Sequence, residues 1–166
     1  MHGNLLITKL IVDKQSGLIL GAQVLGPGDV SKQVAIWAMA IKGKLTVDDM
    51  VNADLPYAPP FSLAIDHSTA TAHIIQNKLK GFFTGISAEQ FKEKLKEKTP
   101  VFLLAVRNPD EYELMRLGVG ERLIPLGQLR KRLEEMPQDK HTEIIPWCKI
   151  SLRGYEAAVI LQGKGY

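Results

Sequence analysis

The stretch EIIPWCKISLRGYEAAVIL, residues 143–161, decides how the second half of this chain is expected to fold. It begins with a short apolar, β-prone run that ends at Cys148, the single cysteine of the sequence. Four residues separate Cys148 from Arg153. An alanine-rich run follows, and its apolar residues have the spacing of one helix face. The pattern therefore predicts a strand, a short polar turn that holds the cysteine, and a helix.

Such a turn places the sulfur of Cys148 near the positive end of a helix, among backbone N–H groups that stabilise an anion. Lys149 and Arg153 add positive charge on either side. Both effects favour the thiolate, which is the nucleophilic form of cysteine. A lone cysteine is also commonly a small buried apolar residue, but Lys149, Ser151 and Arg153 make a poor apolar environment. We therefore predict that Cys148 and Arg153 are catalytic and that Lys149, Ile150, Ser151 and Leu152 form an anion-binding loop.

The bulk properties of the 166 residues indicate a soluble globular protein, with 45% hydrophobic and 23% charged residues. The net charge is +3, and lysines and glutamates are interspersed without a dense basic stripe, so nucleic acid is not an expected partner. One cysteine excludes an intramolecular disulfide, and the four histidines have no metal-ligand spacing with it. The sequence has no secretory signal and no apolar run long enough to cross a bilayer. We expect a cytoplasmic protein without a bound metal or a membrane contact.

The first half of the chain alternates between strand and helix signals. Residues 5–12 and 18–25 are β-prone runs around a loop that ends in glycine, which predicts an antiparallel hairpin. Residues 30–43 have helical periodicity and end at a glycine. Short acidic and polar caps predict two further helices, and a proline-rich extended segment separates them. These two helices are expected at residues 46–51 and 66–80, and the extended segment at residues 52–62.

The second half shows the order of an α/β unit. Residues 101–106 (VFLLAV) form a continuous apolar run, as in a buried parallel strand. Residues 143–147 predict the next strand, and residues 117–126 are expected to be irregular. Helices are expected at residues 87–98, 110–116 and 127–135 and after the Cys148 loop. Strands that alternate with helices predict a small parallel sheet.

Three segments of this half resemble the rhodanese-type sulfurtransferases. CKISLRGYEAA is similar to their active-site loop, AVRNPDEY to their Asp-Val-Arg motif, and IPLGQLRKRLEEMP to their Ile-Pro-Leu helix. Cysteine phosphatases have a related loop, but with five residues between cysteine and arginine, so the four found here favour the smaller sulfur-binding loop. The resemblance implies sulfur transfer through a persulfide of Cys148, with a sulfane-sulfur donor and a thiol acceptor, coenzyme A persulfide being one candidate.

This half also departs from the rhodanese pattern. Ala105 stands where the family has an aspartate that pairs with an arginine and supports the loop, and residues 115–119 replace a Gly-His-Ile segment. Ser151 stands where the loop usually has glycine, and it would be strained if that position requires a positive φ. The chain stops at Tyr166, before the last strand and helix of the family. These departures keep open a second hypothesis, a non-catalytic dimerisation or regulatory fragment with an inactive rhodanese fold.

The first half resembles the dimerisation domain of FAD-dependent pyridine nucleotide-disulfide oxidoreductases. The similarity lies in KLIVDKQSGLILGAQVLG and DLPYAPPFS, although Asp66-His67-Ser68 departs from the usual Lys-Asp-Pro. In the coenzyme A disulfide reductase branch, the tyrosine that corresponds to Tyr57 reaches the active-site cysteine of the partner subunit. The resemblance therefore implies a homodimer, with Tyr57 at its interface.

Together the resemblances identify the chain as similar to the C-terminal part of a coenzyme A disulfide reductase or NADH-dependent persulfide reductase. We predict an α+β partial dimerisation domain in residues 1–83, followed by a small α/β rhodanese-like domain in residues 84–166. No cofactor is expected in this chain. FAD and NADH are implied for the full-length family proteins, so their flavin-dependent reductase activity is not expected of these residues alone.

Overall fold

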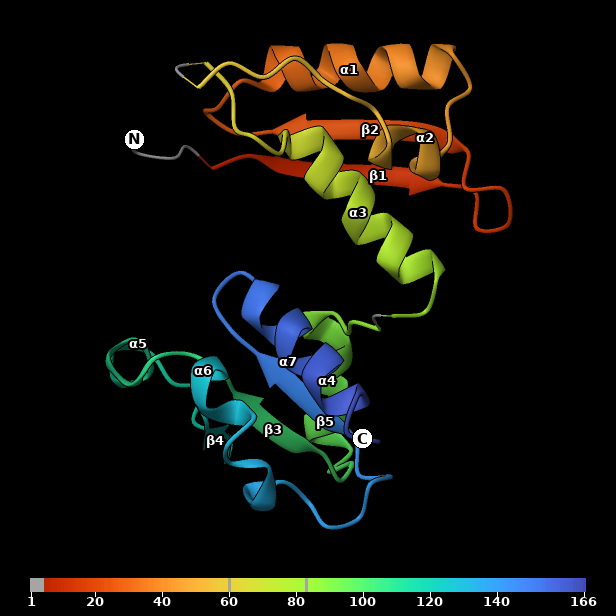
Figure 1. The fold of residues 1–166 in the computed structure, drawn as a ribbon. Coiled ribbons are helices and arrows are strands. Elements are labelled where there is room, and N and C mark those ends of the chain that lie inside the picture. The colour runs from red at the N-terminus through yellow and green to blue at the C-terminus, as the bar shows by residue number, and fades with distance from the viewer. Residues whose placement is uncertain (1–4, 60, 83) are drawn as a thin grey trace. The chain divides into compact units, whose positions relative to one another are not determined.

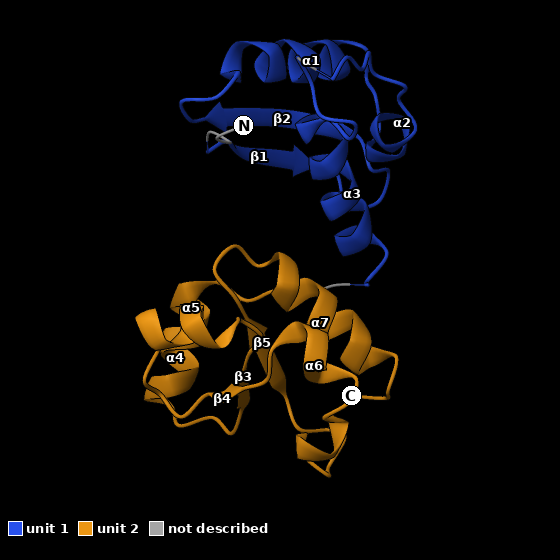
Figure 2. Ribbon diagram, turned by 60° about the vertical axis from the view of Figure 1, so that its left-hand side comes forward, with its two compact units in different colours: residues 1–82 blue, residues 83–166 orange. Residues whose placement is uncertain are grey.

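The structure is a computed structural model that describes residues 5–59, 61–82 and 84–166. Residues 1–4 and Pro60, which belong to the predicted first domain, lie outside the described residues, as does Phe83, the predicted domain boundary. The chain divides into two compact units, Met1–Phe82 and Phe83–Tyr166. Figure 2 colours the two units separately.

The first unit is built on the predicted antiparallel hairpin, which the structure confirms. Strand β1 (Ile7–Val12) pairs with strand β2 (Ile19–Leu25), with Ile7 opposite Leu25. The connecting turn is held by the carboxylate of Asp13, which accepts hydrogen bonds from the backbone N–H groups of Gln15 (3.2 Å) and Ser16 (2.7 Å). Three helices follow, α1 (Val30–Lys42), α2 (Val47–Val51) and α3 (His67–Leu79), and α1 runs alongside the hairpin (Figure 1).

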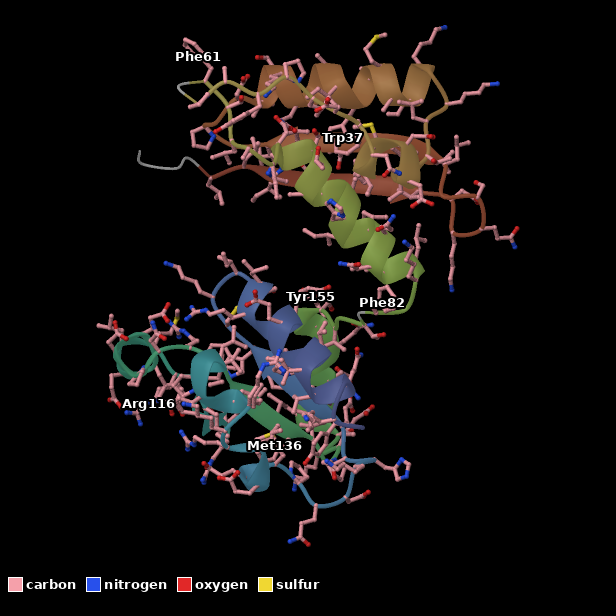
Figure 3. All side chains as sticks on the ribbon, in the orientation of Figure 1. Trp37, Phe61, Phe82, Arg116, Met136 and Tyr155 are labelled. Atoms are coloured by element: carbon pink, nitrogen blue, oxygen red, sulfur yellow. The ribbon has the colours of Figure 1, made fainter. Side chains whose placement is uncertain are left out.

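The hairpin buries one face and exposes the other. On the buried face, Ile19 packs in a cluster with Trp37, which is 1% exposed and labelled in Figure 3, and with residues from all three helices. On the opposite face, Ile7, Ile11 and Leu25 are 51%, 56% and 71% exposed. Side chains alternate along a strand, so these three aliphatic residues lie on one outward face, with the paired Lys9 and Gln23 between them, and we call it the outer hairpin face.

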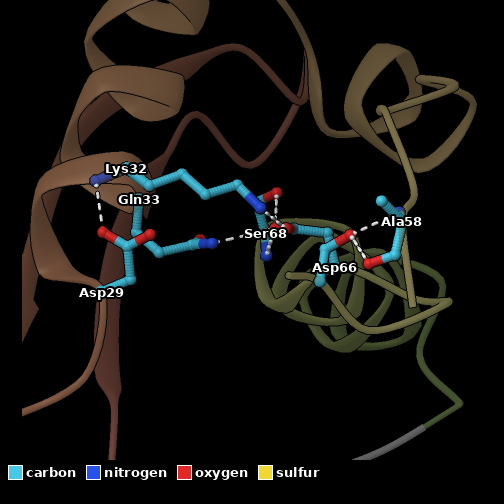
Figure 4. Close-up of polar contacts among 7 residues, drawn as sticks. Asp29, Lys32, Gln33, Ala58, Asp66 and Ser68 are labelled. Atoms are coloured by element: carbon cyan, nitrogen blue, oxygen red, sulfur yellow. Dashed lines mark hydrogen bonds and ion pairs between the residues drawn. The ribbon is translucent and has the colours of Figure 1, made fainter. Parts of the chain in front are cut away.

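A polar cluster joins α1 to the start of α3 (Figure 4). Asp66 caps α3 and accepts hydrogen bonds from the backbone N–H and hydroxyl of Ser68. The same carboxylate accepts hydrogen bonds from Nζ of Lys32 at 2.7 Å and from Nε2 of Gln33 at 2.9 Å. Burial raises the pKa of Asp66, but these hydrogen bonds outweigh burial and hold the pKa well below its ordinary value. The charged cap therefore fixes α3 against α1.

The second unit contains a three-stranded parallel sheet in the order β4-β3-β5, which confirms the predicted parallel α/β arrangement. Strand β3 (Phe102–Ala105) is central, with β4 (Arg122–Leu123) on one side and β5 (Ile144–Trp147) on the other. The helices are α4 (Ala88–Lys96), α5 (Pro109–Leu114), α6 (Leu126–Leu129) and α7 (Leu152–Gln162), with a 3₁₀ turn at Leu133–Glu135.

Two expectations for this unit were wrong. Residues 117–126 were expected to be irregular, but Arg122 and Leu123 pair with β3. A strand of two residues has no alternation pattern and exists only through its partner. The helix expected over 127–135 is divided, because the backbone leaves the helical region at Arg132 (φ −122, ψ 29). There the Arg132 guanidinium binds both Gln128 and Glu135, which holds two short turns in place of one helix.

The core of the second unit lies between β3 and helices α6 and α7. Leu104 and Val106 are fully buried there with Leu129 of α6 and with Ala157 of α7. Because side chains alternate along β3, Leu103 points to the other face of the sheet. The candidate site lies at the end of β5, beside α7.

Candidate active site at Cys148

Cys148 follows the last residue of β5 directly, at the carboxyl end of the parallel sheet. Its side chain is half-buried and packs against the core cluster beneath α7. In open α/β sheets the carboxyl ends of the strands are where ligands bind. The fold thus places the predicted nucleophile at the end of the sheet where α/β proteins bind their ligands.

The loop after Cys148 turns sharply into α7. Ser151 has φ 66 and ψ −17, in the left-handed region that an L-residue adopts only at a cost. The position therefore does require the positive φ that glycine usually provides, and Ser151 adopts it. Residues Lys149, Ile150, Ser151 and Leu152 are all exposed, and α7 begins at Leu152. The predicted anion-binding loop is thus a solvent-facing turn at a helix start.

Arg153 is held by a carboxylate that the sequence analysis did not identify. Its guanidinium donates two hydrogen bonds to Glu111, Nη1 to Oε2 at 2.6 Å and Nη2 to Oε1 at 2.8 Å. Glu111 also accepts the backbone N–H of Asn108 at 2.9 Å. The bond from Arg153, and then that from Asn108, lower the pKa of Glu111 from 4.5 to about 2. Glu111 therefore supplies a carboxylate partner for Arg153, whereas Ala105 is fully buried in β3 and offers none.

The sequence contained a signal for Glu111. It stands three residues after Asn108 at a proline-led helix start, the spacing at which a side chain reaches back to the cap. Nothing local indicated that it also reaches Arg153, 42 residues further along the chain. The pair with Glu111 chiefly, and the nearby Cys148 to a smaller degree, raise the pKa of Arg153. The Arg153 guanidinium thus interacts chiefly with the Glu111 carboxylate and, more weakly, with Cys148.

A second arginine lies under the site. Arg107 is 3% exposed, donates from Nη1 to the carbonyl of Met115 at 2.7 Å, and lies 5.4 Å from the ring centroid of Trp147. Because Trp147 immediately precedes Cys148, this cation–π contact helps to fix the end of β5. Sequence reasoning did not assign Arg107 a role.

A cavity of about 430 Å³ lies beside Cys148, within the second unit. One wall comes from residues 84–88 and Phe91, and the opposite wall comes from α7, including Tyr155, which Figure 3 labels. Residues 143–148 form its floor, and Cys148 lies at one end of that run. A volume of this size is typical of small-molecule sites.

Tyr57 lies in the first unit, in the extended segment between α2 and α3, and is 56% exposed. Nearby Phe61 is 89% exposed and lies at the outer tip of this segment (Figure 3). Within residues 5–59, 61–82 and 84–166, the structure has no group of three or more His, Cys, Asp or Glu side chains that could hold a metal ion. The helices in the same ranges include none that is long and apolar enough to span a membrane.

Comparison with known proteins gives a family match for the first half of the chain and two structural matches for nearly the whole chain. Residues 1–69 match the family described as pyridine nucleotide-disulphide oxidoreductase, dimerisation domain. A curated relative, the NADH oxidase of Streptococcus pyogenes serotype M6, is 32% identical over 72 residues, which are 43% of this chain and 16% of that protein. A dimerisation domain supports a homodimer.

Two solved structures resemble nearly the whole chain. The reduced Bacillus anthracis CoADR-RHD is 37% identical with a TM-score of 0.89, over 99% of this chain and 29% of that chain. The NAD-dependent persulfide reductase from A. fulgidus is 36% identical with a TM-score of 0.80, over 96% of this chain and 27% of that chain. The chain therefore spans less than a third of the length of each of these relatives.

Proposed function

We propose that this chain transfers sulfane sulfur through a persulfide on Cys148. The chain carries the dimerisation domain of the pyridine nucleotide-disulphide oxidoreductases. It corresponds to the C-terminal part of the coenzyme A disulfide and persulfide reductase type. The observation that carries the proposal is the placement of Cys148. The residue is half-buried at the carboxyl end of a parallel strand, beside Arg153 and a cavity.

The proposed chemistry has two steps. The Cys148 thiolate attacks the sulfane sulfur of a donor such as thiosulfate, the S–S bond of the donor breaks, and sulfite leaves with the electron pair. The persulfide then takes up a proton. A thiol acceptor, as its thiolate, attacks the outer sulfur of the persulfide, and the electron pair of the broken S–S bond returns to Sγ of Cys148.

The side chains around Cys148 have separate roles in this proposal. The Arg153 guanidinium stabilises the anionic persulfide, together with backbone N–H groups of the loop 149–152 and the start of α7. Glu111 holds that guanidinium by a bidentate pair, which limits its orientations. No step involves FAD or NADH, which the family resemblance assigns to domains beyond these residues.

The two units have separate parts in this proposal. We assign residues 84–166 to a rhodanese-like domain, supported by the parallel sheet that ends at Cys148 and by the similarity to CoADR-RHD. Residues 1–83 form the dimerisation part, and the outer hairpin face or residues 52–62, with Tyr57, form the contact between two copies. A free reactive thiol suits the reducing cytoplasm, where we place the protein.

Mass spectrometry tests the proposal directly. The intact chain is incubated with thiosulfate or a polysulfide, and a gain of one sulfur on Cys148 is expected, which cyanide or a thiol then removes. Cys148→Ser must show no gain under the same conditions. A folded wild-type chain that never gains sulfur would refute transfer and favour the alternative, a non-catalytic dimerisation or regulatory fragment.

A further inference from the structure

The segment between α5 and β4, residues 115–121, contributes a wall of the cavity beside Cys148 (Figure 1). Leu117 is the residue of this segment that lines the cavity. It is also 45% exposed, and a side chain that lines a cavity while half-exposed lies where the cavity opens to solvent. The same segment departs from the Gly-His-Ile of the rhodanese pattern, so the family resemblance gives Leu117 no role.

Arg107 fixes the start of the segment to the end of β5. Its Nη1 donates to the carbonyl of Met115 at 2.7 Å, and its guanidinium lies 5.4 Å from the ring centroid of Trp147. Arg107 is 3% exposed, so close packing leaves this side chain few other positions. Because Trp147 directly precedes Cys148, Leu117 enters the cavity at its Cys148 end.

One carboxylate fixes the rest of the segment. Glu121 accepts three backbone hydrogen bonds, from the N–H groups of Leu117 (2.7 Å), Gly118 (3.1 Å) and Val119 (3.0 Å). Gly118 and Gly120 have φ of 72 and 88, a left-handed conformation that turns successive N–H groups towards one anion. Glu121 directly precedes β4, which pairs with β3, so its carboxylate joins the Leu117 turn to the sheet.

The Glu121 carboxylate is charged in this arrangement. Burial raises its pKa, but the hydrogen bonds from backbone N–H groups outweigh burial and hold the pKa below its ordinary value. Hydrogen bonds to an ionised acceptor are stronger than neutral ones. The described residues 115–120 are exposed and lie outside the helices and strands. The bonds to Glu121, more than packing, therefore decide where Leu117 lies.

We infer that Leu117 is a gate at the mouth of the cavity, which limits the access of molecules in solution to Cys148, and that Glu121 is the positioning residue that holds this gate closed. The inference deepens the proposed function and rests on it in one respect, namely that reaction takes place at the sulfur of Cys148. It adds the regulation of that site. The closed gate slows attack on the Cys148 persulfide, and loss of the bonds to Glu121 opens it.

Two maleimides of different bulk measure access to Cys148 without depending on sulfur transfer. The Cys148 thiolate adds to the double bond of the maleimide, and the adjacent carbon takes up a proton. Because Cys148 is the single cysteine, intact mass spectrometry follows this residue alone. Rates for N-ethylmaleimide and for the bulkier N-(1-pyrenyl)maleimide are each divided by the rate with 2-mercaptoethanol. The access quotient, bulky over small, cancels any change in the thiolate fraction of Cys148, because both reagents consume the same thiolate.

Leu117→Ala and Val119→Ala form a matched pair. The two side chains are 45% and 44% exposed, but of the two only Leu117 is among the described residues that line the cavity. Leu117→Ala should raise the access quotient about tenfold or more, because a closed gate is open for about a tenth of the time or less. Val119→Ala should leave it within about twofold. An unchanged quotient in Leu117→Ala, or an equal rise in Val119→Ala, would overturn the inference.

Glu121→Ala tests whether the carboxylate acts through Leu117. Alone, it should raise the access quotient about tenfold or more, because it removes three hydrogen bonds to a charged acceptor. In a chain that already carries Leu117→Ala, it should add no more than about twofold, because no gate is left to release. Equal effects in both backgrounds would refute the positioning role. If Glu121→Ala does not fold, Glu121→Gln keeps one acceptor oxygen and should give a smaller rise that Leu117→Ala again abolishes.

Failure of the gate and failure of the proposed function give different results. Persulfide formation in the wild type, with an access quotient that Leu117→Ala does not change, refutes the gate alone. A quotient that rises in Leu117→Ala but not in Val119→Ala, in a chain that never gains sulfur, supports the gate and refutes the proposed function alone.

Discussion

Replacement of Ser151 by glycine should stabilise the second unit, because Ser151 has the backbone conformation that glycine adopts freely. At φ 66 an L-residue in the left-handed region loses about 1–2 kcal/mol. Glycine removes this cost but adds about 0.5–1 kcal/mol of unfolded-state entropy. The Ser151 side chain makes no capping hydrogen bond to α7, so its removal costs little else. We expect a net gain of about 0.5–1 kcal/mol.

The gain can be measured as the free energy of opening of α7 and β5, by peptide-resolved hydrogen exchange in increasing urea. Lys98→Gly is the matched control, because Lys98 follows α4 in the same unit and also has a positive φ, 54. Both variants should be more stable than the wild type, but only Ser151→Gly alters the loop after Cys148. If Lys98→Gly is stabilised and Ser151→Gly is weakened, the left-handed assignment of Ser151 would be refuted.

Three further outcomes are expected. Arg153→Ala should lower sulfur transfer by about 10²-fold or more, measured as the rate of mass gain on Cys148. If the same variant is instead largely unfolded, the arginine has a structural role. The pKa of Glu111 is lowered from 4.5 to about 2, so its ion pair stabilises the fold fully above pH 4.5, and this contribution is lost as the pH falls towards 2. Between these pH values, the urea midpoint of unfolding should fall more steeply for the wild type than for Glu111→Gln. Wild-type chains should self-associate through an interface of roughly 1,600 Å², which sedimentation can detect. Ile11→Lys on the outer hairpin face should weaken this association. A wild-type monomer of 18.4 kDa at high micromolar concentration would contradict the predicted interface.

Much of the local structure could be predicted from the sequence, because its causes are local. Thr46 and Ser87 form capping boxes with the residues three positions later, and Asp66 caps its helix as the residue types indicate. The hairpin followed from two β-prone runs around a turn held by Asp13. The order of strand, cysteine turn and helix followed from the change of periodicity at Cys148.

Other features depend on residues that are distant in sequence and meet only in the folded chain. Glu111 and Arg153 are 42 positions apart, so neither predicts the other. Strand β4 is too short to have a pattern and forms because β3 is beside it.

The cavity is decided by tertiary structure alone. It exists because the open edge of β5 lies between α4 and α7, two helices separated by more than half of the second unit. Periodicity and capping record which face of an element is buried and where the element begins. They do not indicate which elements pack together, and this packing determines the surroundings of Cys148.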